Sequence, residues 1–237
     1  MSRPAHKGGP ADRGTAAQPS VPSTQELITL GAPIVLRDGS RVRIRQGRPS
    51  DDELLMRGFE RLSPRSRYRR FLVPLPHLGE ETVRYLTDID HHDHEAMIAL
   101  DERCEEGIGV ARYIRHPNRP DTAEVAETVI DDWQRRGLGT VLLGVISARA
   151  RQEGINTFTA LMLAENHEMR DLLEELGPVR IVDHALGTME IEVPIPTVGV
   201  SPALRKLLRI AAQHDAAAPP IPGCESDLAH HRSKASR

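Results

Sequence analysis

Residues 123–163 constrain the fold more than any other part of the chain, because they predict a strand, a helix and a second strand in close succession. The stretches AEVAETVI (123–130) and INTFTALML (155–163) are typical of strands. Between them, LGTVLLGVISARARQEG (138–154) predicts a helix that Gly154 can end. A unit of this length forms a right-handed crossover between two parallel strands. The chain must therefore build a sheet that carries a helix on one face.

The flanking segments predict further strands and helices. We expect strands at 41–45, 95–100 and 108–114, and a closing hairpin over 179–193 that turns at Leu186-Gly187. We expect helices at 50–62 with Ser50 as its cap, from Ser63-Pro64 to about 72, at about 80–88, and at 166–177 ending on Gly177. The predicted class is α/β, with a mixed sheet in which antiparallel strands surround one parallel pair.

Composition divides the 237 residues into a single domain with tails. Residues 1–29 and 215–237 are polar or rich in small residues and proline, so we expect both to be disordered. The domain is expected over 30–198. Residues 199–214 predict an amphipathic helix with basic side chains beside a leucine stripe. We expect it to dock on its own domain, with a membrane surface or a partner as alternatives.

Charge and hydropathy exclude several classes of protein. The formal net charge of −3 argues against a general nucleic-acid binder. No apolar run approaches the ~18 residues that a membrane span needs, and no secretory signal is present, so we expect a cytoplasmic protein without stable membrane insertion. Two cysteines are too few for a disulfide framework. The oligomeric state stays open between monomer and homodimer.

The junction DDWQRRGLGT (131–140) places two arginines and a Gly-x-Gly directly ahead of a predicted helix. N–H groups in the first helical turn have no intrahelical partner, and the helix dipole adds positive charge there. This arrangement predicts a cradle for pyrophosphate, with a plain surface turn as the alternative. The chain has no GxxxxGK[ST], and Leu142 replaces the third glycine of GxGxxG, so the two common nucleotide loops do not match.

A wider pattern around this junction resembles a known family. AEVAETVIDDWQRRGLGTVLL (123–143) is similar to the central motif of the GNAT superfamily of N-acetyltransferases, whose Gln/Arg-x-x-Gly-x-Gly/Ala loop binds acetyl-CoA. LAENHEMRDLLEELG (163–177) resembles the second cofactor motif of that superfamily. LSPRSRYRRF (62–71) resembles a helix of the bacterial protein-lysine acetyltransferase type. The resemblance covers roughly residues 33–195 and implies the GNAT fold.

The resemblance implies acetyl-CoA as cosubstrate and acetyl transfer to a primary amine, most closely a protein lysine. It places pyrophosphate at the loop and the pantetheine arm along the strand before it, with Asn166 on the other side. The implied cofactor-binding residues are Val129, Ile130, Gln134, Arg135, Arg136, Gly137, Leu138, Gly139, Thr140 and Asn166. The superfamily needs no metal.

The acceptor amine must lose a proton, since a lysine ammonium has a pKa of about 10.4. Glu124 and Glu127 are the candidate bases, and the resemblance favours Glu124. In a regular strand the two side chains point to opposite faces, whereas a bulge would change this and keep Glu127 in reserve. Either glutamate could instead be a solvated strand residue.

The chain departs from the family pattern where many members carry a tyrosine that protonates the departing thiolate. Leu173 stands at that position, and Pro178 replaces the usual aromatic residue after the helix. This gap motivates one alternative, a non-catalytic acyl-CoA-binding regulator. Acetylation of a small amine stays open as a second enzyme alternative. Three histidines in DIDHHDHEAM (88–97) invite a metal interpretation, but their spacing matches no ligand motif, so we expect a polar loop beside the acceptor cleft.

Overall fold

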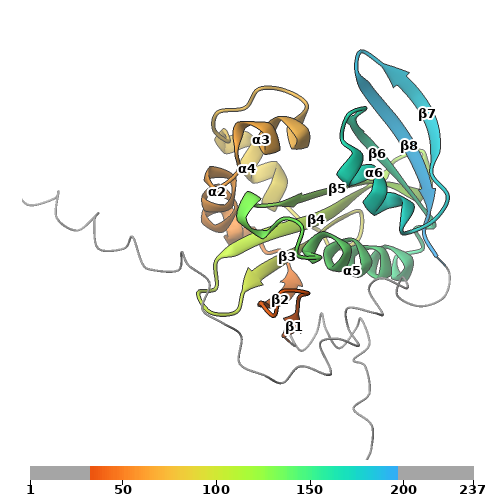
Figure 1. Cartoon of the computed structure of the whole chain (residues 1–237). Helices are drawn as coiled ribbons and strands as arrows, with labels where there is room; N and C mark the ends of the chain where they lie inside the picture. Colours follow the sequence, from red (N-terminus) through yellow and green to blue (C-terminus); the bar gives the residue numbers. More distant parts are fainter. Residues whose placement is uncertain (1–32, 197–237) are drawn as a thin grey trace, which may run out of the picture.

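The computed structural model describes residues 33–196 (Figure 1). The predicted tails, 1–29 and 215–237, and the predicted helix at 199–214 lie outside the described residues. The domain predicted over 30–198 is described except for its outermost residues. Within this range no helix is long and apolar enough to cross a membrane.

One eight-stranded mixed sheet organises the domain, in the order β1-β2-β3-β4-β5-β6-β8-β7. This confirms the predicted fold class. The strands are β1 (Ile34–Val35), β2 (Arg41–Gln46), β3 (His94–Asp101), β4 (Gly107–His116), β5 (Arg119–Val129), β6 (Thr157–Leu163), β7 (Arg180–Ala185) and β8 (Thr188–Pro194). The helices are α2 (Asp52–Glu60), α3 (Pro64–Phe71), α4 (Glu80–Thr87), α5 (Leu138–Gln152) and α6 (His167–Glu174), with short 3-10 turns at Pro49–Asp51 and Asp131–Trp133.

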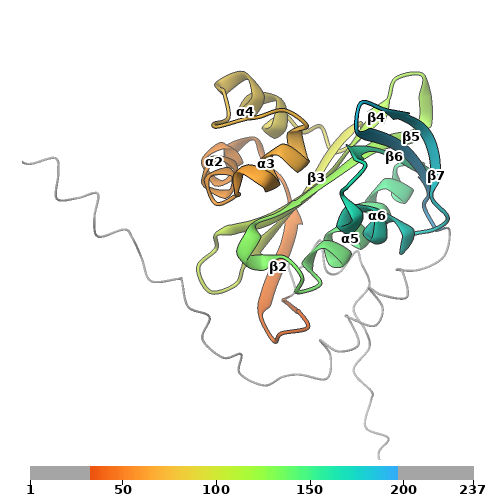
Figure 2. The ribbon, with the colours of Figure 1, turned by 45° about the horizontal axis from the view of Figure 1, so that its top comes forward.

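Helices cover both faces of the sheet, as Figures 1 and 2 show. Helices α2, α3 and α4 lie on one face, and α5 lies across β3, β4 and β5 on the other, with α6 beside it. The core between α5 and the sheet is continuous, because α5 buries most of its length, including Leu138, Leu142 and Ile146. The helix of the predicted crossover unit, α5, therefore forms the main layer on this face of the sheet.

The crossover pair is short. Strand β5 pairs in parallel with β6 only over Thr122–Glu124, opposite Thr157–Thr159. Beyond this point β6 keeps pairing along its whole length with β8, while β5 continues beside β4. The two central strands therefore part, and the side of β5 that would face β6 is left open from residue 125 onward.

Two helix boundaries differ from the prediction. Ser50 does not cap a helix but lies within the 3-10 turn, because the Asp51 carboxylate holds that turn by accepting from Arg48 N at 2.7 Å and pairing with Arg45. Helix α6 ends at Glu174, before Gly177. A Cβ at Gly177 would lie 3.1 Å from the Pro194 carbonyl oxygen, so close packing against β8 accounts for this glycine.

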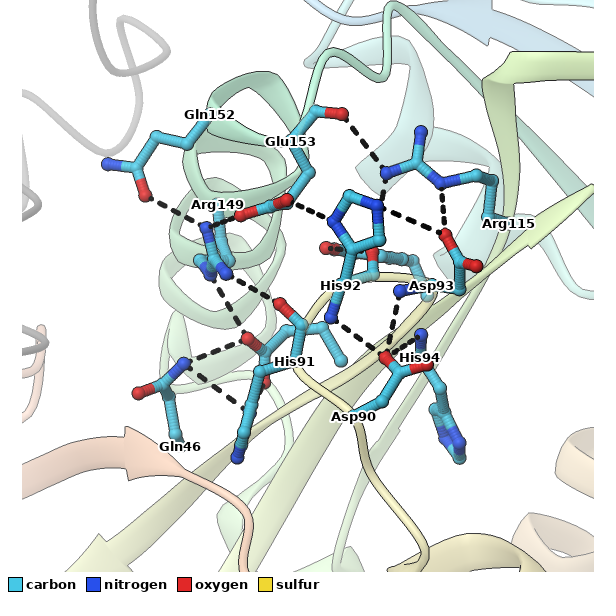
Figure 3. A network of polar contacts seen from close by, with 12 residues as sticks. Gln46, Asp90, His91, His92, Asp93, His94, Arg115, Arg149, Gln152 and Glu153 are labelled. Carbon is cyan, nitrogen blue, oxygen red and sulfur yellow. Dashed lines mark hydrogen bonds and ion pairs between the residues drawn. The ribbon is translucent and has the colours of Figure 1, made fainter.

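A buried carboxylate ties the C-terminal end of α5 to the sheet. Glu95 is fully buried and accepts from Arg149 Nε at 3.1 Å and from Gln46 Nε2 at 2.9 Å, with His91 Nδ1 at 2.9 Å. Arg149 also donates to the His91 carbonyl at 2.6 Å. Figure 3 shows how these contacts hold the loop before β3 against the helix.

We predict that Arg149→Leu lowers the free energy of unfolding by roughly 3–5 kcal/mol, because it leaves the Glu95 carboxylate buried without its cation. Urea denaturation measures this loss. Arg151→Leu, two positions along the same helix, serves as the control and is expected to change the free energy of unfolding by at most about 0.5 kcal/mol. Equal effects from the two variants would contradict a structural role for the Glu95 network.

Candidate active site

The parting of β5 and β6 opens a cleft that holds most of the predicted site. Its walls come from β5, the loop after β5, the N-terminal turn of α5, β6, α6 and the arginine-rich helix α3. Seven of the ten predicted cofactor residues line it: Val129, Gln134, Arg135, Gly137, Gly139, Thr140 and Asn166. The cleft thus brings together residues that are up to 37 positions apart in the sequence.

The remaining three predicted cofactor residues face elsewhere. The side chains of Ile130 and Leu138 are buried in the core, at 3% and 1% exposure. The Arg136 guanidinium pairs with Asp38 at 3.0 Å and lies 4.8 Å from the centre of the Trp133 ring. Any contribution of Leu138 or Arg136 to the cradle must therefore come from the backbone, since their side chains serve the packing of the loop.

The loop has the backbone geometry of an anion cradle. Arg135 and Gly137 both have positive φ, at 60° and 90°, and Gly137 is the N-cap of α5. A positive φ is easy for glycine, which has no Cβ to clash with the following carbonyl. Gly137, Gly139 and Thr140 of this turn line the cleft, and the N–H groups of a first helical turn have no intrahelical partner and carry the partial positive charge of the helix terminus.

Asp131 fastens the loop to α3, and sequence reasoning missed this role. Its carboxylate accepts from Ser63 N at 2.8 Å, from Ser63 Oγ at 2.8 Å and from Ser66 Oγ at 2.9 Å. Burial alone would raise the pKa of Asp131, but the hydrogen bonds from Ser63 and Ser66 outweigh it and hold the pKa below its usual value. The acidic pair in DDWQRR and the Ser-Pro start of α3 were visible signals, but nothing local linked them.

Two amide side chains at the cleft have structural partners. Gln134 Nε2 donates to the Val129 carbonyl at 3.0 Å and so closes the turn at the end of β5. Asn166 is the N-cap of α6, and its side-chain oxygen accepts from Met169 N at 3.4 Å. Both residues position a wall of the cleft, because each fixes the start or the end of an element that lines it.

The two candidate bases lie on opposite faces of the sheet. The pairing of β4 with β5 is regular from Gly109–Val129 through Arg115–Ala123, so the bulge considered above does not occur between the two glutamates. Glu124 lies opposite Ile114 and faces the side of α2, α3 and α4. Glu127 lies opposite Ala111 and faces α5. Only Glu124 is exposed.

Glu127 lines the same cleft, beneath the loop, and the residue is half-buried. Its Oε2 atom is buried without a hydrogen-bond partner in the described part of the chain. Its Oε1 atom lies so near Gly139 that a Cβ there would approach to 2.5 Å. Burial raises the pKa of Glu127 well above its usual value, because the carboxylate form has no compensating charge. This environment differs from that of Glu124, which is exposed.

The three histidines of the loop before β3 have separate partners. His91 contacts Glu95, and His92 Nδ1 lies 2.5 Å from Glu153 Oε2 (Figure 3). His94 contacts Arg112 Nη1 through Nε2, at 3.1 Å. Among residues 33–196 no three His, Cys, Asp or Glu side chains are grouped so that they could hold a metal ion. Through Arg112, His94 contacts the face of the sheet that α2, α3 and α4 cover.

The arrangement of strands, loop and helices matches a known domain. Residues 41–179 match the acetyltransferase (GNAT) domain family. The chain belongs to the GNAT acetyltransferase family. This confirms the resemblance that the motifs indicated and places the Gln134–Gly139 loop within the matched region.

Relatives in this family support the assignment. Acetyltransferase Pat of Mycolicibacterium smegmatis is 32% identical over 193 residues, which cover 76% of this chain and 57% of that protein. The chain thus spans little more than half the length of this relative. The crystal structure of the GNAT domain of S. lividans PAT is 33% identical with a TM-score of 0.64, covering 69% of this chain and 96% of that one.

The fold is also shared at lower identity. A GNAT superfamily phosphinothricin acetyltransferase from Sinorhizobium meliloti, solved in complex with AcCoA, is 19% identical with a TM-score of 0.53. The match covers 68% of this chain and 96% of that one. The fold therefore persists where few residues are shared.

We predict that Gly139→Ala destabilises the protein by about 1–3 kcal/mol, because the new Cβ meets the enclosed Glu127 carboxyl group. Gly58→Ala in α2 is the matched control, since its Cβ has nothing nearer than 3.9 Å and alanine favours a helix. The double variant Gly139→Ala, Glu127→Ala should recover part of the loss. Thermal denaturation of the four proteins tests this, and a Gly139→Ala protein as stable as Gly58→Ala would contradict it.

Glu127 should also make stability depend on pH. A carboxyl group whose pKa is raised by folding contributes stability that is present below its unfolded pKa and is lost as the pH rises through the folded value. Glutamine mimics the neutral form, so Glu127→Gln should become more stable relative to the parent protein as the pH rises from 5 to 8. Urea unfolding at each pH measures the difference, and a difference that does not change with pH would be the opposing result.

Proposed function

We propose that this chain transfers an acetyl group from acetyl-CoA directly to a primary amine, and that the amine is the side chain of a protein lysine. The observation that carries the proposal is the cleft between β5 and β6, which has an amide cradle at one end and Glu124 at the other. The names of the Pat relatives support an acetyltransferase, and the fold neighbour solved with AcCoA supports the donor.

The donor is proposed to lie along the open side of β5. Its pyrophosphate would accept from the first N–H groups of α5, from Gly137 to Thr140, with Arg135 nearby. Its pantetheine arm, which carries amide groups, would take the place of a neighbouring strand along residues 125–129. This placement uses backbone groups of β5 that β6 leaves unpaired.

Glu124 is proposed to act as the base. The amine nitrogen attacks the thioester carbonyl carbon, the C–S bond breaks, and CoA leaves as the thiolate. One proton of the ammonium goes to the Glu124 carboxylate before the attack, directly or through a water molecule, and the second proton that the nitrogen loses as the amide forms passes to the thiolate through water. Both glutamates line the cleft, and Glu124 suits this role better because it is the more exposed of the two and faces the helices opposite α5.

The departing thiolate receives no help from a tyrosine in this structure. Leu173 is fully buried in the core, and no tyrosine within residues 33–196 lines the cleft. The thiol of CoA is acidic enough for its thiolate to leave, and it can take a proton from water. The proposed reaction therefore requires from the protein one base and the positioning of the amine against the thioester. Such positioning is worth several powers of ten in rate.

We predict that Glu124→Gln lowers kcat for a lysine peptide by about 10²–10⁴-fold and leaves the Kd for acetyl-CoA within about twofold. Steady-state kinetics and calorimetric titration measure the two quantities. Glu81→Gln, an exposed acid on α4 that lines neither the cleft nor the pocket under α2, is the control and should match the parent protein.

The same experiment separates the other functions. Turnover of small amines without turnover of peptides would show a small-amine acetyltransferase. Saturable acetyl-CoA binding with no acetylated product would show an acyl-CoA-binding regulator. Absence of acetyl-CoA binding would contradict the proposal as a whole.

A further inference from the structure

Two arginines lie together on the face of the sheet that Glu124 occupies, and within residues 33–196 neither forms an ion pair with a carboxylate. Arg112 is on β4 and Arg70 is in the last turn of α3. Both line a pocket with largely apolar walls between α2, α3, α4 and the sheet. Arg70, Phe71 and Thr128 also line the cofactor cleft, so the pocket and the cleft adjoin.

Arg112 is buried with neutral partners. The residue is only 4% exposed, and alanines lie opposite it on both neighbouring strands, Ala96 and Ala126. Its Nη1 atom donates to the Leu86 carbonyl at 3.2 Å and contacts His94 Nε2 at 3.1 Å. Burial and the charge of Arg112 lower the pKa of His94, which therefore offers no compensating charge. Burial and the charge of Arg70 lower the pKa of Arg112 to about 9.

Arg70 reaches the same pocket from the helix side and is half-buried. Its guanidinium carbon lies 5.2 Å from the centre of the Phe71 ring. No hydrogen bond or ion pair joins it to another side chain in the described part of the chain. Burial lowers the pKa of Arg70, and the negative charge of Glu124 partly opposes this. Both arginines line the same pocket, and the charge of Arg70 lowers the pKa of Arg112.

Arginines elsewhere in the domain show the usual solution. Arg45 pairs with Asp51, Arg115 with Asp93, and Arg149 with Glu95, each within 3.1 Å. Asp51 is the carboxylate among the residues that line the pocket, and its pairing with Arg45 already uses it. Buried cations are generally paired or hydrogen-bonded to an anion, so the pocket lacks the group that Arg70 and Arg112 need.

The position of Glu124 indicates where that anion comes from. Arg112 is opposite Ala126, and Glu124 is two residues from Ala126 on the same face. Such diagonal neighbours on paired strands lie about 7–8 Å apart, within reach of long side chains. The face therefore presents one negative group beside two positive ones. Its complement is a ligand that carries an amine and a carboxylate a few bonds apart.

We propose that Arg70 and Arg112 bind a carboxylate of the acceptor, so that the preferred acceptor is a lysine beside an aspartate or glutamate. This inference rests on the proposed function, because it uses Glu124 as the group that faces the amine. Arg70 and Arg112 are binding residues in this scheme, and they take no part in the transfer of the proton. In an apolar pocket a guanidinium–carboxylate pair is strengthened by the exclusion of water.

Paired peptides test the inference on the full chain. One peptide carries glutamate on both sides of a single lysine, and its partner carries glutamine there. We expect kcat/KM to be about 10–100-fold higher for the acidic peptide, through KM. Equal values for the two peptides would overturn the inference.

Arg112→Gln and Arg70→Gln should each remove most of this preference, so that the kcat/KM values for the acidic and the neutral peptide become nearly equal. Arg84→Gln, an exposed arginine on α4 that lines neither the pocket nor the cleft, is the matched control and should keep the preference. Because Arg112 is a buried cation that has no ion pair with another side chain of residues 33–196, Arg112→Gln should not lower Tm. A lowered Tm together with a retained preference would show a structural role instead.

Two further measurements separate the sources of the carboxylate. If Arg112→Gln alters the ratio of succinyl-CoA to acetyl-CoA use but not the peptide preference, the site binds the acyl group, and the assignment to the acceptor is wrong.

If no peptide is acetylated, the lysine proposal fails, and Nα-acetyl-lysine is then compared with its amide. A preference for the free carboxylate that Arg112→Gln removes would still support the arginine pair, and no preference would overturn it.

Discussion

The separation of two strands is the constraint on which the rest of this structure depends. A backbone N–H or C=O that is removed from water must find a hydrogen-bond partner, so a sheet does not normally open in its middle. Here β6 follows β8 and β5 follows β4, and only three residue pairs join the two halves. The opened edge of β5 is acceptable because it lines a cleft, and a strand-like ligand can complete it.

The alternation of side chains along β5 determines which of its two glutamates faces the helices α2, α3 and α4. Glu124 and Glu127 are three residues apart in one strand, yet they face opposite layers of the domain. The first is exposed beside α3, and the second is half-buried under the glycine loop, with its Oε2 atom shielded from solvent. Two identical side chains thus have different environments, and only the first combines access to solvent with access to the helix α2–α4 face. The regular pairing with β4 creates this difference.

Much of the fold could be predicted from the sequence, because its signals are local. Period-two and helical patterns located the crossover unit, and Ser63 and Asn166 cap α3 and α6 at the starts that the sequence indicated. Boundaries set by contacts were less predictable, as Ser50 shows. Asp51 fixes that turn through Arg45, and no pattern around residue 50 reveals this pair.

The candidate site was predictable to the same extent. The loop, Glu124 and Asn166 follow from motifs, but partners distant in sequence do not. Arg136 reaches Asp38, which is 98 positions away, and so packs the loop instead of entering the cleft. Arg70 and Arg112 come together only because a helix covers a strand, and no spacing in the sequence encodes that contact.

The hydrogen bonds of Asp131 have a thermodynamic consequence. They join the start of α3, on the arginine side of the cleft, to the loop that begins α5. A ligand that orders the loop would reduce the conformational freedom of α3, so a second ligand at α3 would lose less entropy on binding. Such coupling is reciprocal, since each ligand must change the affinity of the other by the same factor. The Asp131 carboxylate can in this way couple the affinities of two ligands without any movement of the sheet.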